Sequence, residues 1–210
     1  MEADFWHKLW ETNNTGWHLD DTNPLLETFF SELQLKENSR VFIPLCGKTL
    51  DIVWLLSHGY KVVGAELNEI AIKELFKSLS VEPKIKKLGE LTLYQAENID
   101  IFVGDIFELT AESLGKVEAI YDRGALVALP QEMRVAYSAL LKQISKTAPQ
   151  LLINFEYDQT LMDGPPFSIS KAEIEIHYAE SYAIKLLKSF ELKAGSFKQT
   201  GATENIWLLN

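Results

Sequence analysis

The feature that most constrains the fold is an alternation, beginning at Arg40, between short apolar runs and stretches with helical spacing. Such an alternation is typical of a parallel sheet whose strands are joined by crossover helices. The expected strands are residues 41–45, 61–66, 99–103, 117–121 and 151–155. We therefore expect an α/β fold of the Rossmann-like type, with a mostly parallel sheet and helices on both faces.

The stretches between these runs have the spacing and end signals of helices. Asn68 is suited to cap a helix that Pro83 ends, and a Leu-Gly-Glu turn within residues 84–96 predicts a small hairpin insertion. The expected helices are residues 50–57, the stretch after Asn68, 131–146 and about 172–178. Two further apolar runs, at residues 184–187 and 206–209, follow near the end of the sequence.

Residues 1–38 precede the first expected strand and are rich in aromatic side chains. Phe5, Trp6, Leu9 and Trp10 fit one face of a helix, and Asn23-Pro24 begins a second helix. No repeat or low-complexity linker interrupts the rest. We expect a single domain spanning residues 1–210, with residues 1–38 as a helical cap or lid and residues 39–210 as the α/β core.

Composition excludes several classes of protein. The chain carries 30 acidic and 20 basic side chains, a formal net charge of −10, so we expect no nucleic-acid partner. No apolar run reaches the ~18 residues that span a bilayer, and residues 1–10 are acidic and aromatic, unlike an export signal. We expect a cytoplasmic protein with no membrane partner. Cys46 is the only cysteine, which excludes an intramolecular disulfide and a multi-cysteine metal site.

The carboxyl ends of the expected strands carry the residues that point to a ligand. In an open α/β sheet, ligands bind in the crevice outside these ends. Gly47 would let a ligand approach the backbone of the first turn, although a glycine after a strand is as often only a turn. Glu66 follows Gly47 by 19 residues, close to the ~20 at which a carboxylate binds ribose hydroxyls. A nucleoside is therefore the expected ligand.

The first turn departs from the dinucleotide-binding fingerprint, because residues 44–48 offer one glycine where that fingerprint has three. A pyrophosphate would be poorly held, whereas S-adenosylmethionine, a nucleoside without a phosphate bridge, fits. Asp105 would then accept the adenine amino group, and the backbone amide of Ile106 would reach a ring nitrogen. Asp105 is equally suited to cap the short helical turn at Ile106, and the two roles can coexist.

Six sequence stretches carry a resemblance to a known family. They are Phe5-Trp6-His7-Lys8-Leu9-Trp10, Pro44-Leu45-Cys46-Gly47-Lys48-Thr49-Leu50-Asp51, Val63-Gly64-Ala65-Glu66-Leu67, Gly104-Asp105-Ile106-Phe107, Tyr121-Asp122-Arg123-Gly124-Ala125-Leu126-Val127-Ala128-Leu129-Pro130 and Gly164-Pro165-Pro166-Phe167. On these motifs the chain resembles, over nearly its whole length, the bacterial type of the thiopurine S-methyltransferase family. The resemblance implies a seven-stranded class I methyltransferase sheet with the last strand antiparallel, and S-adenosylmethionine as methyl donor without a metal.

The resemblance also implies roles for individual residues. Trp10 would cover the donor, Leu45 would contact it, Glu66 would hold its ribose, and Arg123 would reach the active site. Two positions depart from the usual family pattern. Trp17-His18 stands where Phe-His is frequent, and Thr49 replaces a serine. These departures concern the shape of the acceptor pocket more than donor binding.

Methyl transfer from a sulfonium to a thiolate is an in-line displacement that depends on alignment and desolvation. A cation that favours the anionic acceptor serves this reaction, and Arg123 is the candidate catalytic residue. Its alternative role is an ion pair with Asp122 or Glu156. His7 and His18 could remove a proton or be structural. Residues 164–167 could line the acceptor pocket or form only a stiff turn.

We expect an enzyme that methylates the sulfur of thiopurines or related aromatic thiols, in the manner of a detoxifying methyltransferase, and that acts as a monomer on a small-molecule thiol. One alternative keeps the fold and methylates tellurium or selenium species or another small metabolite. A second alternative is a non-catalytic S-adenosylmethionine sensor. A third, a nicotinamide-dependent oxidoreductase, is disfavoured by the missing glycines.

Overall fold

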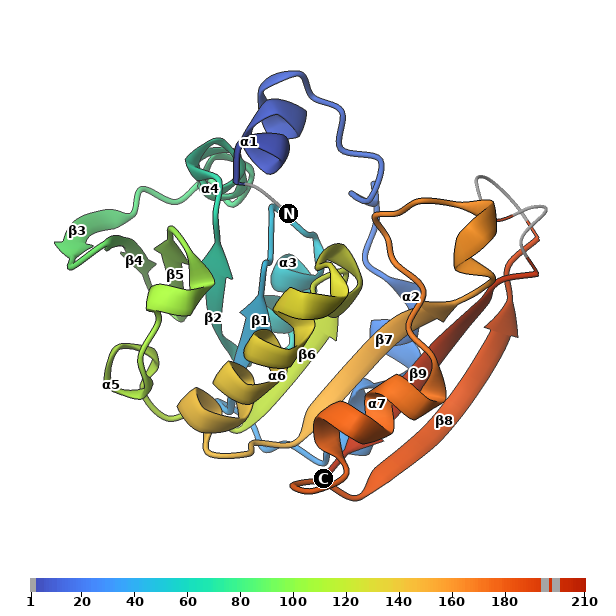
Figure 1. The fold of residues 1–210 in the computed structure, drawn as a ribbon. Coiled ribbons are helices and arrows are strands. Elements are labelled where there is room, and N and C mark those ends of the chain that lie inside the picture. Colours follow the sequence, from blue (N-terminus) through green and yellow to red (C-terminus); the bar gives the residue numbers. More distant parts are fainter. Residues whose placement is uncertain (1–2, 194–196, 198–200) are drawn as a thin grey trace.

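The structure, a computed structural model, describes residues 3–193, 197 and 201–210 (Figure 1). Their strands form a single sheet in the order β3-β4-β5-β2-β1-β6-β7-β9-β8. The strands are β1 (Arg40–Pro44), β2 (Lys61–Glu66), β3 (Lys84–Leu88), β4 (Leu91–Ala96), β5 (Ile99–Val103), β6 (Ala119–Arg123), β7 (Gln150–Glu156), β8 (Ile184–Glu191) and β9 (Thr203–Leu209). The alternation in the sequence thus builds the expected α/β architecture.

The five central strands, β5, β2, β1, β6 and β7, pair in parallel, and β9 runs antiparallel to both of its neighbours. The expectation of seven strands was wrong, because the described residues form a nine-stranded mixed sheet. The hairpin β3–β4 accounts for the difference. Leu91 and Tyr94 of β4 are buried, and β4 pairs antiparallel with β5, so the insertion extends the sheet instead of standing apart from it.

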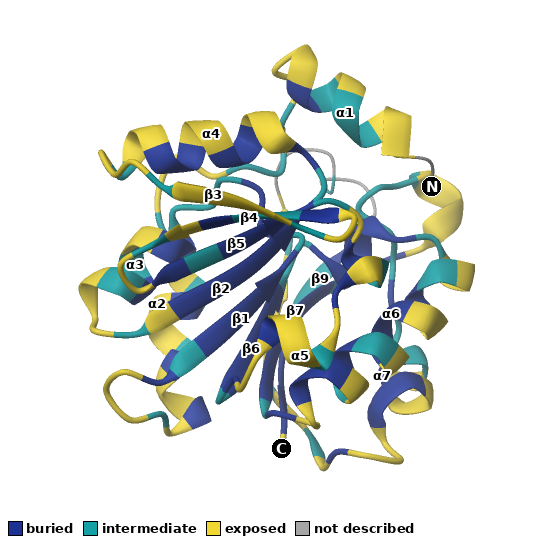
Figure 2. Ribbon diagram, turned by 90° about the vertical axis from the view of Figure 1, so that its left-hand side faces the viewer, coloured by how far each residue is buried: buried dark blue, intermediate teal, exposed yellow. Residues whose placement is uncertain are grey.

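Helices cover both faces of the sheet (Figure 2). One apolar cluster joins α2, η1, α3 and α4 to side chains such as Val41 and Ile43, and the other joins α5, α6 and α7 to Phe42 and its neighbours. Successive β1 side chains therefore enter opposite layers, as strand geometry requires. The α-helices are α1 (Ala3–Glu11), α2 (Pro24–Phe29), α3 (Asp51–Ser57), α4 (Glu69–Ser78), α5 (Ala111–Leu114), α6 (Gln131–Ser145) and α7 (Lys171–Tyr178). The 3₁₀ turns are η1 (Phe30–Leu33), η2 (Ile106–Glu108), η3 (Leu126–Ala128) and η4 (Gln159–Leu161).

The two helices of residues 1–38 occupy different places. Helix α1 lies above the carboxyl ends of the central strands, whereas α2 and η1 pack on a face of the sheet beside α3 (Figures 1 and 2). Asn23 caps α2 with its side chain, and its own N–H donates to Asp51 Oδ1 at 2.8 Å. The other Asp51 oxygen accepts the Tyr121 hydroxyl at 3.0 Å. Asp51 thus fixes the point at which the chain, coming from α1, reaches the face of the sheet and begins α2.

In the part of the chain that the structure describes, no helix combines the length and the apolar character needed to cross a membrane.

Candidate active site

The first turn, between β1 and α3, meets the end of β2 through Glu66. Its buried carboxylate accepts the backbone N–H of Gly47 at Oε2 and that of Asn68 at Oε1, each at 2.8 Å. Burial raises the pKa of Glu66 above its ordinary value, and the backbone N–H groups counteract part of that rise. The structure therefore brings Gly47 and Glu66 together, and one carboxylate braces both strand-end loops.

Gly47 is fixed by its backbone conformation and by its neighbour Trp10. Its φ is +52°, and a β-carbon there would lie 3.2 Å from Trp10 Cζ2. Trp10 is only 6% exposed and has the Lys48 ammonium 5.7 Å from its ring centroid. Helix α1 also contacts the end of β2, because His7 Nδ1 lies 3.0 Å from Nδ2 of Asn68, which follows that strand. Helix α1 is thus docked directly on the turn that the sequence analysis assigned to the donor.

Leu45, Asp105 and Ile106 lie at the same edge of the sheet, after β1 and β5. Leu45 is half-buried with a φ of +46°, and Ile106 is buried in the apolar layer. Asp105 is exposed and accepts the N–H of Phe107 at 3.0 Å, which caps η2. The capping role of Asp105 is therefore present, and its exposed carboxylate remains accessible from the edge of the sheet.

Arg123 ends β6, and no carboxylate lies within ion-pair distance of it among the described residues. Its half-buried guanidinium donates from Nη1 to the carbonyl oxygen of Trp17 at 3.0 Å. Asp122, one of the two expected ion-pair partners, instead accepts the Tyr137 hydroxyl at 2.7 Å and the Leu126 N–H at 3.1 Å. Burial raises the pKa of Asp122 to about 6. Arg123 is thus a cation with donors left for an anion.

His18, which was considered from the sequence as a group that could remove a proton, lies close enough to Arg123 for the charge of Arg123 to affect its pKa. Burial, the Lys48 ammonium and Arg123 lower the pKa of His18, while Asp20 and Glu74 oppose that change. Burial and the two cations therefore favour the neutral imidazole and make His18 a weaker base than a free histidine.

Glu204 of β9, which no sequence motif singles out, is half-buried. Burial raises its pKa, and the charge of Arg123 counteracts that rise. The sequence separation of 81 residues between the two side chains left no local signal for their proximity.

The segment between β7 and α7 is held by hydrogen bonds to its neighbours. The Phe167 N–H donates to the carbonyl oxygen of Val127 in η3 at 2.7 Å, and the Tyr157 hydroxyl donates to the carbonyl oxygen of Pro166 at 2.5 Å. Since η3 begins three residues after Arg123, the first of these bonds ties the turn at residues 164–167 to the segment that follows Arg123. Tyr157 could not be selected from the sequence, because its role depends on the path of that turn.

Among the described residues, Cys46 and the other potential metal ligands are not gathered into a site. The Cys46 thiol is buried, and burial raises its pKa well above the ordinary value. Its sulfur packs against Gly64, where a β-carbon would lie only 2.8 Å away. These contacts give Cys46 a packing role. The described residues also contain no group of three or more His, Cys, Asp or Glu side chains placed to hold a metal ion.

The family model described as thiopurine S-methyltransferase matches residues 1–207. A thiopurine S-methyltransferase of Xanthobacter autotrophicus is 46% identical over 210 residues, covering 100% of this chain and 99% of that protein. One of Teredinibacter turnerae is 46% identical over 210 residues, with 100% and 98% covered. One of Gluconobacter oxydans is 42% identical over 205 residues, with 98% and 93% covered.

Solved structures show the same fold at much lower identity. A SAM-dependent methyltransferase of Anabaena variabilis superposes with a TM-score of 0.67 at 16% identity, covering 99% of this chain and 93% of that one. A 1,6-didemethyltoxoflavin-N1-methyltransferase of Burkholderia thailandensis, solved with S-adenosylhomocysteine bound, gives a TM-score of 0.67 at 13% identity, with 99% and 85% covered. The sheet and its helical layers are therefore those of a methyltransferase fold.

Proposed function

This chain belongs to the thiopurine S-methyltransferase family, and from that premise we propose that it methylates the sulfur of thiopurines and related aromatic or heterocyclic thiols. S-adenosylmethionine would donate the methyl group, giving a methyl thioether and S-adenosylhomocysteine. The observation that carries this proposal is Arg123, a half-buried guanidinium without a carboxylate partner among the described residues, at the same sheet edge as the Gly47–Glu66 turn.

The donor would bind at the turn after β1. The residues there suit a nucleoside, because Glu66 keeps lone pairs for ribose hydroxyls and Gly47, which has no β-carbon, lets Trp10 pack directly on the turn. Trp10 would cover the donor from α1 with a flat, buried ring. We assign the donor site to Trp10, Leu45, Gly47, Glu66, Asp105, Ile106 and Arg123.

The acceptor would bind beside Arg123, and the chain's own part in the chemistry is to favour its anionic form. Donors that are fixed before the reaction act more strongly in a site shielded from water than in solution. Arg123 is oriented in this way by the Trp17 carbonyl. Nucleophilic attack by the thiolate needs no covalent enzyme intermediate, so alignment and desolvation are the main requirements.

An assay of methyl transfer tests this proposal. The protein is incubated with S-adenosylmethionine and, separately, with aromatic thiols, aliphatic thiols, and tellurium and selenium oxyanions. Turnover of the aromatic thiols supports the proposal. Turnover of the oxyanions alone, or donor binding without any methylated product, would replace it with a chalcogen methyltransferase or with a sensor.

The role of Arg123 is tested by two variants that differ in charge. Arg123→Met should lower kcat at neutral pH by about tenfold for each unit by which the pKa of the bound thiol rises when the cation is lost, because a smaller share of the acceptor is then ionised. Arg123→Lys keeps the charge and should recover part of that loss. Because Arg123 is also assigned to the donor site, affinity for S-adenosylhomocysteine should fall in both variants, but by a smaller factor than kcat. Unchanged kcat in Arg123→Met contradicts the assignment.

We further propose a cytoplasmic monomer of one domain that detoxifies thiols. The single cysteine in 210 residues supports the cytoplasmic assignment, because disulfides accumulate in oxidising compartments. Cell fractionation tests the location, and light scattering of the purified protein tests the oligomeric state.

A further inference from the structure

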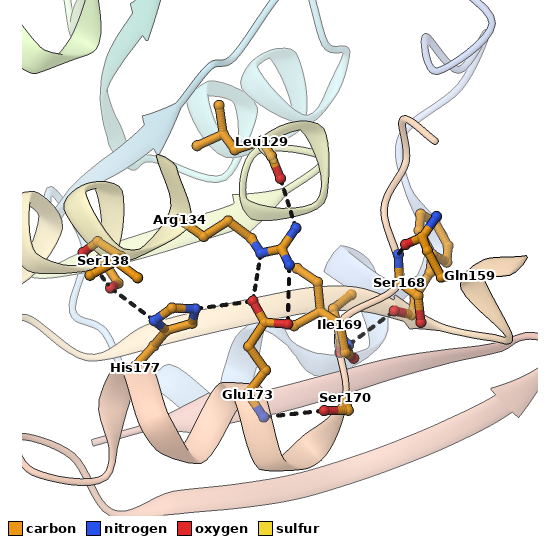
Figure 3. A network of polar contacts seen from close by, with 12 residues as sticks. Leu129, Arg134, Ser138, Gln159, Ser168, Ile169, Ser170, Glu173 and His177 are labelled. Carbon is orange, nitrogen blue, oxygen red and sulfur yellow. Dashed lines mark hydrogen bonds and ion pairs between the residues drawn. The ribbon is translucent and has the colours of Figure 1, made fainter. Parts of the chain in front are cut away.

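An ion pair between the buried Arg134 and the partly buried Glu173 joins α6 to α7 (Figure 3). Arg134 donates from Nε to Glu173 Oε1 at 2.6 Å and from Nη2 to Oε2 at 3.1 Å. Its remaining nitrogen, Nη1, donates to the carbonyl oxygen of Leu129 at 2.8 Å. The guanidinium is therefore fully held, because all three of its nitrogens have acceptors and the fork geometry allows one orientation.

Further contacts fix Glu173 from the α7 side. His177 Nε2 lies 3.2 Å from Glu173 Oε1, and the other ring nitrogen of His177 lies 3.4 Å from Ser138 Oγ of α6. The backbone N–H of Glu173 donates to Ser170 Oγ, which caps α7. A buried ion pair adds little to stability over apolar packing, because both charges lose their hydration. Its more specific effect here is to set the geometry of the groups around it.

Arg134 contacts the ring of Phe167, in the turn at residues 164–167. The guanidinium carbon of Arg134 lies 5.9 Å from the centroid of the Phe167 ring, a cation–π contact. Gly164 lies against the same ring, since a β-carbon at Gly164 would be 2.7 Å from Phe167 Cδ1. With the Phe167 N–H bound to the Val127 carbonyl, the ring and the backbone of this residue are both fixed.

We propose that Arg134 is a positioning residue for the methyl acceptor. Held by Glu173, it holds Phe167 and thereby keeps the turn at residues 164–167 as a wall of the acceptor site beside Arg123. This inference rests on the proposed function, and it adds a residue that acts on the acceptor alone, without contact to the donor. It also predicts that Arg134 and Phe167 act as one unit.

The test compares Arg134→Lys with Arg40→Lys. Arg40 is a matched control, because it also binds a carboxylate, Asp100, and a backbone carbonyl, that of Leu114, but at the amino end of β1. Both variants lose a guanidinium that joins a carboxylate to a backbone carbonyl. Only Arg134→Lys should raise the KM for an aromatic thiol, by about tenfold, with a smaller change in kcat and unchanged calorimetric affinity for S-adenosylhomocysteine.

Two further variants make the result independent of one substitution. Glu173→Gln keeps the shape of the partner, and Phe167→Leu replaces a half-buried ring while leaving both charged residues of the ion pair in place. Each should raise acceptor KM in the same way, and Arg134→Lys combined with Phe167→Leu should raise it no more than the stronger single variant. Acceptor KM at the wild-type value in the folded variants, or an equal rise in Arg40→Lys, overturns the proposal. Absence of turnover on every thiol by the wild type instead contradicts the proposed function.

Discussion

Replacing Gly47 with alanine tests whether the first turn and α1 form one donor site. The backbone φ of +52° at Gly47 is unfavourable for alanine by about 1 kcal/mol. The added β-carbon would also lie 3.2 Å from Trp10 Cζ2, closer than ordinary van der Waals contact, so Trp10 must move by a few tenths of an ångström. The substitution therefore disturbs both the path of the turn and the side chain that covers it.

Gly59→Ala separates these two effects. Gly59 follows α3 with a φ of +79°, and nothing lies within 4 Å of a β-carbon built there. Both substitutions should lower the free energy of unfolding in urea by about 1 kcal/mol through backbone strain. Only Gly47→Ala should weaken binding of S-adenosylhomocysteine, by about tenfold, equivalent to about 1.4 kcal/mol.

Isothermal titration calorimetry with S-adenosylhomocysteine measures the second effect. Trp10→Phe removes the ring atom that the new methyl group meets, so Gly47→Ala should weaken binding less in that background than in the wild type. The reasoning is refuted by wild-type affinity in Gly47→Ala, or by an equal loss in Gly59→Ala.

Three further substitutions test single contacts. Glu66→Ala should weaken donor binding at least about tenfold in the same titration, because the ribose loses a charged acceptor. Asp122→Asn should flatten the dependence of stability on pH. The pKa of Asp122 rises from 3.8 to about 6 on folding. The stabilising contribution of its protonated form is therefore complete below pH 4 and is lost as the pH rises through 6. In the wild type, urea titration should show a fall of about 3 kcal/mol in the free energy of unfolding over this range. Asp51→Ala should cost about 3 kcal/mol by the same method, because the Asn23 N–H and the Tyr121 hydroxyl lose their buried acceptor.

Most of the sheet followed from local patterns. The apolar runs located the five parallel strands to within two residues, since strands buried on both faces need nearly continuous apolar side chains. The largest shift among them is in β6, expected at residues 117–121 and found at Ala119–Arg123. The strand continues through Asp122 because Tyr137 and Leu126 satisfy its buried carboxylate, a tertiary effect that no local pattern contains.

The C-terminal hairpin was harder to predict. The run at residues 184–187 belongs to β8, which extends to Glu191, and the run at residues 206–209 belongs to β9, which begins at Thr203. Strand β8 is at the edge of the sheet and is largely exposed, so much of it is polar and carries little of the apolar signal on which strand prediction depends.

In the candidate site, spacing predicted the meeting of Gly47 with Glu66, because a turn and a strand end in consecutive units of a parallel sheet must lie side by side. The hydrogen bond from Arg123 to the Trp17 carbonyl could not be predicted from spacing. Its acceptor is a backbone carbonyl, which every residue has, 106 positions away in sequence. The pairing of Arg134 with Glu173 had the same obstacle, since other carboxylates in the sequence could equally have been its partner.

The N-terminal segment connects the two halves of the site. Trp10 packs on the turn at Gly47, the proposed donor site, and seven residues later the Trp17 carbonyl accepts a hydrogen bond from Arg123, the proposed acceptor-side cation. Trp10 and Trp17 are also in edge-to-face contact, with ring centroids 5.7 Å apart, so a shift of one ring displaces the other. In the proposed site, the cover of the donor and the orientation of the cation would therefore depend on the same packing. Such a site would favour the anionic thiol most when α1 is seated over the donor, which would also be the state in which methyl transfer occurs.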